Sequence, residues 1–562
     1  MAQLTGAQII WESLVKEGVE VIFGYPGGAI LPTYDAMLDY PIHHVLTRHE
    51  QGATHAADGY ARASGKVGAV IVTSGPGATN TVTGLATAML DSSPIVCITG
   101  QVGSSVLGSD AFQEVDVTGI TLPITKHNYL VTRADDIART IHEAFYIAKS
   151  GRPGPVLVDI TKDAQNAKTE FVYPTQVEMH KRHEHLLSES QLKRAAEMID
   201  QAERPVILAG HGVLISGAMR QLRDLAEKTQ TPVALTLLGI GVFPREHPLC
   251  LGMMGMHGEA YANRAVQAAD LVIGIGMRFD DRVTGNLKTY SPHSKKIHIE
   301  IDRSEIAKNV HVDLPLVGDA AGVMDQLIPL VSAQQRHNWI EQIDEWADDT
   351  RARDILKRDA SGKLLPPHVI GDLWQATGGD AIVVSDVGQN QMWEAQYYRH
   401  SAPRSLITSG GLGTMGFALP AAMGVKFARP EAEVWVVAGD GGFQMTAAEL
   451  QTIQQESLKI NIAILNNGFL GMVRQWQEFF YQRRYAATPI TSPDFVKLAD
   501  AHGIAGIRVT KREDVIPAIQ TARDHPGSML IDFRVESEES VYPMVPAGAD
   551  LHAMIRRPVE AS

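Results

Sequence analysis

A chain of 562 residues is long enough for several domains and large buried cores without disulfides or structural metals. Its two cysteines lie in apolar runs, its formal net charge is −14 and no long run of Lys or Arg occurs, so a disulfide framework, a nucleic-acid partner and an anionic membrane surface are poor hypotheses. The N-terminus shows no signal or transit pattern and no apolar run is long enough to cross a bilayer, so we expect a cytoplasmic protein with no membrane partner.

The first part of the chain, residues 1–163, alternates short apolar runs with helical stretches. Val70–Thr73 and Ile95–Ile98 read as buried strands, and Ala78–Leu90 reads as a helix between them. Residues 164–187 break the pattern and read as a linker. The histidines of that linker, within residues 180–185, are better explained by a solvated segment than by a metal site.

The same alternation returns twice more. Residues 188–331 contain strand-like runs that end in glycine, which suits a doubly wound sheet with a ligand across the carboxyl ends of its strands. A charged connector at 332–365 leads to residues 366–562, where strands are expected at 381–385, 434–438 and 460–465. The predicted fold is therefore α/β, with three doubly wound parallel-sheet domains.

Two polar motifs follow successive strands in the third domain. The strand Val434–Ala438 ends at Gly439-Asp440-Gly441-Gly442, and the next strand ends at Asn466-Asn467. The 27 residues from Asp440 to Asn467 suffice for one crossover helix, so both side chains are expected at one edge of the sheet. One carboxylate and one amide oxygen are a plausible protein share of a Mg²⁺ shell, and the glycines let the backbone approach a diphosphate.

This paired motif resembles the signature of thiamine-diphosphate enzymes. The resemblance implies that Asp440, Asn467 and the carbonyl of Phe469 ligate Mg²⁺, which holds the cofactor diphosphate.

The loop Gly411–Gly416 also matches the dinucleotide fingerprint G-x-G-x-x-G, but no good strand precedes it. In the thiamine interpretation this loop contacts the cofactor pyrimidine instead, with Met415 as a wedge. The implied thiamine-diphosphate contacts are Tyr25, Pro26, Gly28, Glu50, Gln389, Asn390, Gly413, Met415, Gly439, Asp440, Gly441, Gly442, Asn467 and Met472. Many relatives carry His at the position of Asn390, and serine or an alanine–serine variant is frequent at that of Gly442.

A thiamine enzyme needs a carboxylate on the aminopyrimidine, and Glu50 is the candidate. It follows a strand-like run, His44–Thr47, and opens a helix. An acid favoured by the helix dipole would look the same. An apolar site would raise the pKa of this carboxyl and help it to share a proton.

Further segments resemble acetohydroxyacid synthase, also called acetolactate synthase, over nearly the whole chain. The most specific are Arg278-Phe279-Asp280-Asp281-Arg282 and Met472-Val473-Arg474-Gln475-Trp476. The resemblance implies decarboxylation of pyruvate and transfer of the hydroxyethyl group to a second 2-oxo acid, either pyruvate or 2-oxobutyrate, in branched-chain amino-acid biosynthesis. Arg282 would grip the acceptor carboxylate, unless it only pairs with Asp280 or Asp281. Trp476 would form an apolar wall for the acceptor, and Gln113 and Lys126 match polar positions of the active site.

The family also binds FAD, which the resemblance assigns to the middle domain. Glu300 or Asp302, at a strand end, would bond a ribose hydroxyl. The implied flavin contacts are Arg152, Gly210, Gly212, Thr236, Leu237, Met256, His257, Gly276, Arg278, Asp280, Val283, Glu300, Ile301, Asp302, Asp319 and Ala320.

Two other functions remain open at this point, an FAD-dependent pyruvate oxidase of the same fold and a non-catalytic nucleotide-binding protein. The resemblance also implies a homodimer or homotetramer, in which the glutamate of one chain faces the diphosphate site of another. A separate small regulatory subunit is usual in the family.

Overall fold

The computed structural model describes residues 3–174, 187–358 and 362–559. Within these ranges lie three six-stranded sheets in which all neighbouring strands run parallel. The predicted fold class is confirmed. The histidine cluster of the first predicted linker lies outside the described residues.

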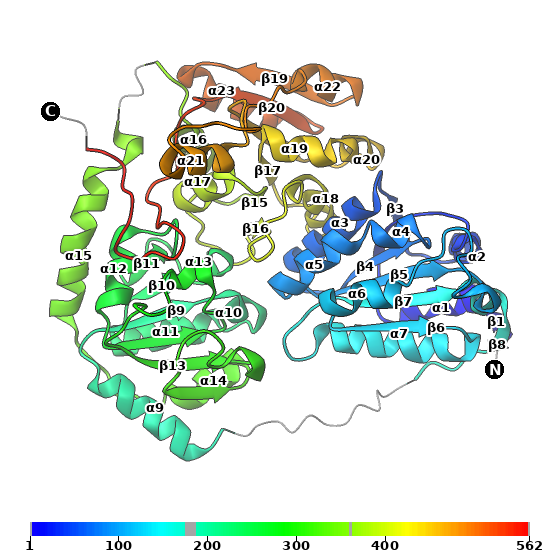
Figure 1. Ribbon diagram of the computed structural model, residues 1–562, viewed down its shortest axis with the longest axis horizontal. Helices are drawn as coiled ribbons and strands as arrows, with labels where there is room; N and C mark the ends of the chain where they lie inside the picture. Colours follow the sequence, from blue (N-terminus) through cyan, green and yellow to red (C-terminus); the bar gives the residue numbers. More distant parts are fainter. Residues whose placement is uncertain (1–2, 175–186, 359–361, 560–562) are drawn as a thin grey trace.

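Each sheet defines one domain, and the three lie around a common centre (Figure 1). The first sheet has the order β3 (His43–Leu46), β2 (Val21–Tyr25), β4 (Gly68–Val72), β5 (Ile95–Gln101), β7 (Val156–Thr161), β6 (His127–Val131). The second has the order β11 (Cys250–Met253), β10 (Val233–Leu235), β9 (Pro205–Ala209), β12 (Leu271–Ile275), β13 (Lys295–Glu300), β14 (Leu314–Val317). The third has the order β16 (Leu406–Thr408), β15 (Ile382–Ser385), β17 (Val434–Gly439), β18 (Asn461–Asn466), β20 (Met529–Arg534), β19 (Ala505–Val509).

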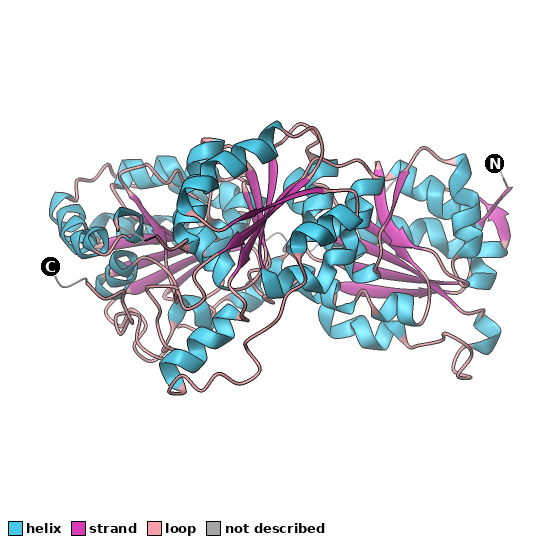
Figure 2. Ribbon diagram, turned by 90° about the horizontal axis from the view of Figure 1, so that it is seen from above, coloured by secondary structure: helices cyan, strands magenta, loops and turns pink. Residues whose placement is uncertain are grey.

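Helices cover both faces of every sheet, as Figure 2 shows for strands enclosed between helical layers. This explains why the central strands are continuous apolar runs with every residue buried, as in β4, β9 and β12. The first sheet is covered by α1 (Gly6–Lys16) and α7 (Ala134–Lys149) on one face, and by α3 (Glu50–Ser64) and α5 (Val82–Asp91) on the other. The second carries α9 (Glu189–Gln201), α11 (Met219–Thr229) and α14 (Ala320–Leu327) opposite α12 (Ala260–Ala268). The third carries α18 (Ala418–Ala428), α20 (Leu450–Gln455) and α22 (Phe495–Ala501) opposite α16 (Pro366–Thr377), α17 (Gln389–Tyr397) and α23 (Val515–Asp524).

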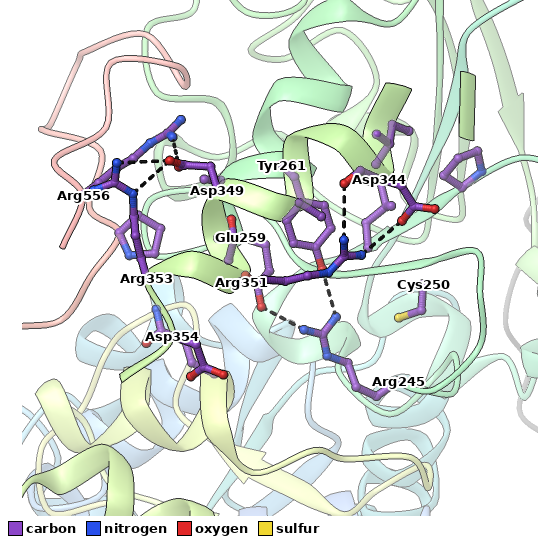
Figure 3. A pocket seen from close by; sticks show the side chains of 18 of the residues that line it. Arg245, Cys250, Glu259, Tyr261, Asp344, Asp349, Arg351, Arg353, Asp354 and Arg556 are labelled. Carbon is purple, nitrogen blue, oxygen red and sulfur yellow. Dashed lines mark hydrogen bonds and ion pairs between the residues drawn. The ribbon is translucent and has the colours of Figure 1, made fainter. Parts of the chain in front are cut away.

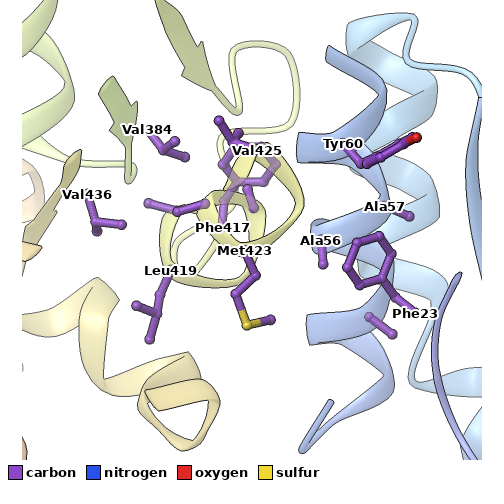
Figure 4. Packing of buried hydrophobic residues seen from close by; sticks show 14 of the residues in the cluster. Phe23, Ala56, Ala57, Tyr60, Val384, Phe417, Leu419, Met423, Val425 and Val436 are labelled. Atoms are coloured by element: carbon purple, nitrogen blue, oxygen red, sulfur yellow. The ribbon is translucent and has the colours of Figure 1, made fainter. Parts of the chain in front are cut away.

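The first and third domains share one hydrophobic core, centred on helices α3 and α18 (Figure 4). Their backbones approach so closely that a Cβ added at Gly424 would lie 1.8 Å from the carbonyl oxygen of Ala56. A Cβ at Gly59 would lie 2.0 Å from the carbonyl oxygen of Ala421. Glycine is therefore required on both helices, and the two domains are packed as one unit.

Both predicted linkers contain regular structure. Within 164–187, β8 (Lys168–Glu170) pairs antiparallel with β1 (Gln3–Thr5). Within 332–365, α15 (His337–Ala352) packs on the middle domain, where the indole of Trp339 donates to the carbonyl of Pro205 at 3.1 Å. The domain bounds drawn from the sequence stay predictions.

The C-terminal tail, residues 535–559, runs from the third domain back to the second (red in Figure 1). The amide of Val545 donates to the carbonyl of Met256 at 2.8 Å, and the amide of Asn286 donates to the carbonyl of Ala549 at 3.0 Å. The tail thus ties the two domains together. Among the described residues no helix combines the length and the apolar character needed to cross a membrane.

Candidate active site

Asp440 and Asn467 lie at the same edge of the third sheet, as their spacing predicts. Strands β17 and β18 are parallel neighbours, with Gly439 opposite Leu465, and each of the two polar residues directly follows its strand. A small cavity of about 60 Å³ opens beside Asp440, between Gly439 and Gly441 in its lining, although Asp440 itself is not among the lining residues; we call it the Asp440 cavity. Of the residues predicted to contact the cofactor or the metal, the following line it: Gln389, Asn390, Met415, Gly439, Gly441, Gly442, Asn467, Phe469 and Met472.

The oxygen atoms at this edge fit a cation. Asp440 is fully buried, and burial raises the pKa of its carboxyl to about 6. Its Oδ2 accepts from the hydroxyl of Ser492 at 3.0 Å, whereas its Oδ1 has no hydrogen-bond partner among the described residues. A buried carboxylate oxygen without a partner is costly unless a cation or another donor meets it. No group of three or more His, Cys, Asp or Glu side chains is found in the described parts of the chain, so a metal here would rely on one carboxylate with amide and carbonyl oxygens, the ligands that suit Mg²⁺.

A partly buried hydrogen-bond network orients the side chain of Asn467. Its Oδ1 accepts from the amide of Phe469 at 3.0 Å, and its Nδ2 donates to Gln389 Oε1 at 3.3 Å. The Nε2 of Gln389 in turn donates to Gln475 Oε1 at 2.8 Å and to the carbonyl of Glu539 in the tail at 3.1 Å. The tail therefore reaches the edge of this cavity through two glutamines.

A second, larger cavity of about 1030 Å³ lies where the three domains meet. All sixteen predicted flavin residues except Gly210 and Asp302 line it, as do Arg282 and Trp476. Val387, Gly388, Met415, Met472 and Val473 line both cavities, so the two share a wall. We call the larger one the three-domain cleft.

Two glycine turns meet at one end of the three-domain cleft. The amide of Gly212 donates to the carbonyl of Gly276 at 2.8 Å, and a Cβ at Gly212 would lie 2.5 Å from Gly276 Cα. Gly276 has a φ of +56°, which favours glycine. These turns follow β9 and β12, where a doubly wound sheet binds its ligand.

Some of the charged groups in and beside the three-domain cleft form ion pairs with one another. Arg152 lies 2.9 Å from Glu305 Oε1 and 3.4 Å from Asp302 Oδ2. Burial raises the pKa of Glu300, at the end of β13, to about 7. Asp280 and Asp319 cap α13 (Asp281–Thr284) and α14, so each has a local structural role whether or not a flavin binds.

The two predicted acceptor residues, Arg282 and Trp476, face this cleft from different domains. Arg282 lies on α13 of the middle domain, and Trp476 lies on α21 (Gly471–Phe480) of the third. The Arg282 side chain is 60% exposed and lies 3.7 Å from Asp281, which is a weak pairing at a solvated surface. Its guanidinium therefore keeps donors for a carboxylate.

Within the described residues, Glu50 lies outside the lining of both cavities. Its Oε2 accepts from the Asn80 side chain at 2.9 Å, beside the turn at Gly75, where Gln113 packs. None of Tyr25, Pro26, Gly28, Glu50, Gln113 and Lys126 is among the residues that line either cavity in the described parts of the chain. The ammonium of Lys126 donates to the carbonyls of Ile147 and Ser150 at the end of α7.

Two carboxylates with clear roles escaped the sequence interpretation. Asp386 follows β15 and accepts from the amide of Gly416 at 2.9 Å, and burial raises its pKa to about 7. It could have been found, because it follows a strand as Asp440 does. Glu449 of the third domain accepts from the amides of Arg48 at 3.0 Å and His49 at 3.1 Å, just before Glu50. No local pattern signals that contact across the chain.

Comparisons with known proteins agree with this geometry. Three family models match the chain: the N-terminal TPP binding domain of thiamine pyrophosphate enzymes over residues 4–120, the central domain over 192–327 and the C-terminal TPP binding domain over 386–533. The chain is therefore a thiamine pyrophosphate enzyme.

Its relatives narrow the class. The chain is 50% identical to acetolactate synthase of Mycobacterium bovis, covering 98% of this chain and 91% of that protein. It is 49% identical to the acetolactate synthase large subunit of Corynebacterium glutamicum (97% and 89% covered) and 45% identical to the isozyme 3 large subunit of Escherichia coli (99% and 99%). The chain belongs to the acetolactate synthase family.

Proposed function

We propose that this chain is the catalytic subunit of an acetohydroxyacid synthase. It would decarboxylate pyruvate and join the resulting two-carbon unit to a second 2-oxo acid, giving 2-acetolactate or 2-aceto-2-hydroxybutyrate. The observation that carries the proposal is the wall shared by the Asp440 cavity and the three-domain cleft. It puts a diphosphate anchor next to a cleft that offers a carboxylate-binding arginine.

The unpartnered Oδ1 of Asp440, the amide oxygen of Asn467 and the carbonyl of Phe469 would hold Mg²⁺ and with it the diphosphate. Thiamine diphosphate, when bound, would supply a nucleophilic carbon for the 2-oxo group and a cationic ring that takes up the electron pair released by decarboxylation. Gln389 keeps Asn467 oriented through its hydrogen bond. Met415 and Met472, in the shared wall, keep water from the reacting atoms.

Arg282 and Trp476 would select the acceptor. A guanidinium binds a carboxylate through two hydrogen bonds, and Arg282 keeps donors free for them. Trp476 presents an apolar surface in the same cleft, where the methyl or ethyl group of the 2-oxo acid would lie. The three-domain cleft has the size and the strand-end glycine turns for FAD, with Glu300 toward a ribose hydroxyl.

Glu50 would act across an interface with a second copy of the chain. It sits on a different domain from Asp440, and the neighbouring Phe112 is 88% exposed and Tyr25 40% exposed. Apolar side chains of this size are expected to be covered by a partner. The proposed assembly is a homodimer or homotetramer with shared active sites in the cytoplasm. The relatives are called large subunits, which supports a small regulatory partner for this chain as well.

The decisive experiment is a product assay with pyruvate and 2-oxobutyrate together, with thiamine diphosphate, Mg²⁺ and FAD added or omitted singly. We expect acetohydroxyacids to form only when thiamine diphosphate and Mg²⁺ are present. Anaerobic stopped-flow addition of pyruvate separates the synthase from a pyruvate oxidase. Stoichiometric flavin bleaching at the rate of turnover would contradict the synthase assignment.

A further inference from the structure

Asp91 lies where the three domains meet, at the end of helix α5, and neither set of predicted cofactor contacts contains it. The residue is almost completely buried. It lines the three-domain cleft together with Gly410 and Gly411 of the third domain and His211 of the middle domain. A residue of the first domain thus stands between the other two domains in the wall of this cleft.

The carboxylate of Asp91 holds the start of a loop in the third domain. Its Oδ2 accepts from the amide of Gly410 at 3.0 Å, and its Oδ1 accepts from the amide of Gly411 at 2.6 Å. A Cβ added at Gly411 would lie 2.8 Å from Asp91 Oδ1, so this approach needs glycine.

The same loop is held at two further points on its way to Met415. The hydroxyl of Thr87, one turn before Asp91 on α5, lies 2.8 Å from the hydroxyl of Thr414. The amide of Gly416 donates to Asp386. Met415 lines both the three-domain cleft and the Asp440 cavity, so the position of this loop shapes the proposed thiamine-diphosphate site.

A buried charge cluster makes the loop amides necessary partners of Asp91. The guanidinium of Arg62 lies 2.6 Å from Asp58 Oδ1 and 2.9 Å from Asp91 Oδ2, and all three side chains are buried. One cation therefore faces two carboxylates. Because buried negative charge is costly without donors, the amides of Gly410 and Gly411 supply what Arg62 cannot.

The backbone carbonyl of Asp91 contacts a glycine turn of the middle domain. His211 Nδ1 lies 3.0 Å from this carbonyl, which can only accept, so Nδ1 carries the proton. Burial lowers the pKa of His211 to about 4, and the ring is neutral near pH 7. His211 begins α10 (His211–Ile215), between Gly210 and Gly212. The turn assigned to FAD thus donates one hydrogen bond to Asp91.

We propose that Asp91 is a positioning residue that couples the FAD site to the thiamine-diphosphate site. The inference rests on the proposed function, which places FAD in the three-domain cleft and thiamine diphosphate at the Asp440 cavity. FAD orders the turn at His211, and through the carbonyl of Asp91 it orders the end of α5. The carboxylate there holds the loop that leads to Met415. Whichever cofactor binds first orders these contacts for the second, so each tightens the other by the same factor.

The test is calorimetric titration of the protein with thiamine diphosphate and Mg²⁺, without FAD and with saturating FAD. The ratio of the two Kd values is the coupling factor, and the reverse titration with FAD must return the same ratio. We expect a factor of about 5 or more for the wild type. A factor of about 1 with both cofactors bound would overturn the coupling and leave the proposed function standing. Failure of the wild type to bind either cofactor would refute the proposed function and the coupling together.

Three variants trace the coupling through Asp91. Asp91→Asn sets an NH2 group against donors, because Arg62 and both loop amides donate, so the factor should fall below about 2 and thiamine diphosphate should bind more weakly even without FAD. His211→Phe removes only the hydrogen bond to the carbonyl. It should also lower the factor below about 2, while thiamine-diphosphate binding without FAD stays as in the wild type. His211→Asn, whose amide nitrogen can take the place of Nδ1, should restore most of the factor.

The two His211 variants decide the matter if Asp91→Asn does not fold. A wild-type coupling factor in Asp91→Asn or in His211→Phe would overturn the proposal. So would a factor that His211→Asn leaves as low as His211→Phe does.

Two control variants separate coupling from a merely structural role. Asp349→Asn makes the same chemical change in the wall of a third cavity of about 470 Å³, where Figure 3 shows Arg353 and Arg556 converging on Asp349. Asp372→Asn makes it at a buried carboxylate that pairs with Arg512. Neither aspartate is among the described residues that line the three-domain cleft or the Asp440 cavity. Both variants should lose stability yet keep the wild-type coupling factor, and an equal fall of the factor in them would refute the role of Asp91.

Discussion

Gly424→Ala tests the close contact between helices α3 and α18. The added Cβ would lie 1.8 Å from the carbonyl oxygen of Ala56, 2.7 Å from its carbonyl carbon and 2.7 Å from the amide nitrogen of Tyr60. All three atoms are backbone, so no side chain can move aside. Reaching 3.0 Å, below which such contacts essentially do not occur, requires the two helices to separate by about 1.2 Å.

Overpacking of this kind costs about 1–3 kcal/mol and occasionally more, whereas the better helix propensity of alanine returns up to about 1 kcal/mol. We expect a net loss of stability and a melting temperature that falls by roughly 2–10 °C in a thermal unfolding scan. Turnover should fall as well, because Glu50 opens the displaced helix.

Gly322→Ala is the matched control. Gly322 also lies in a helix, α14, but a Cβ there would meet nothing within 4 Å. Its melting temperature should stay constant or rise, because the only effect of the substitution there is the higher helix propensity of alanine. Gly59→Ala, on the facing helix, should resemble Gly424→Ala, and the double variant should lose less than the two losses added together, because one separation makes room for both methyl groups. If Gly424→Ala behaves like the control, the close approach of α3 and α18 is refuted.

Four other predictions concern the proposed active site. Glu50→Gln should bind thiamine diphosphate normally yet lose about 100-fold or more in kcat, because an amide cannot share the proton; unchanged turnover contradicts the assignment. Asp440→Asn should weaken Mg²⁺-dependent cofactor binding by more than about 10-fold, measured by fluorescence titration, because even a residue that only orients a metal ligand is worth about that much. Unchanged affinity would exclude Asp440 as a ligand. Arg282→Ala should reduce carboligation about 10-fold more than pyruvate decarboxylation, and an equal loss of both would mean a structural arginine. The pKa of Glu300 is about 7 in the folded chain against 4.5 ordinarily, so the folded flavin-free protein holds a proton that the unfolded chain releases, and its stability falls as the pH rises from about 4.5 through 7. Glu300→Gln should reduce the difference between the melting temperatures at pH 5 and pH 8. An unchanged difference would contradict the raised pKa of Glu300.

The sequence predicts the parts of the site that are local in the chain. Asp440 and Asn467 are each fixed by one strand and the turn that follows it, and parallel pairing then brings them together. The continuous apolar strands likewise predict sheets covered on both faces. Each of these inferences needs only a short window of residues.

Contacts between distant segments are not predictable in this way. Glu449 accepts from the amides of Arg48 and His49, which lie about 400 residues earlier, and nothing near either partner signals the other. Glu50 and Arg282 belong to one predicted catalytic set, and the structure holds them in separate places within one chain, as the expected sharing of the site between subunits requires. A motif identifies which residues take part in a reaction, whereas the subunit that supplies each residue depends on assembly.

The contact between α3 and α18 also has a consequence for biosynthesis. Helix α3 ends at Ser64 and α18 begins at Ala418, so about 350 residues must be translated before α3 meets its partner. At about 5–20 residues per second this takes roughly 20–70 s. During that time the nascent first domain displays an apolar, glycine-lined helix surface with no cover from its own chain. We expect ribosome-associated chaperones to bind nascent chains that end before residue 418, and that binding to decline once α18 has emerged.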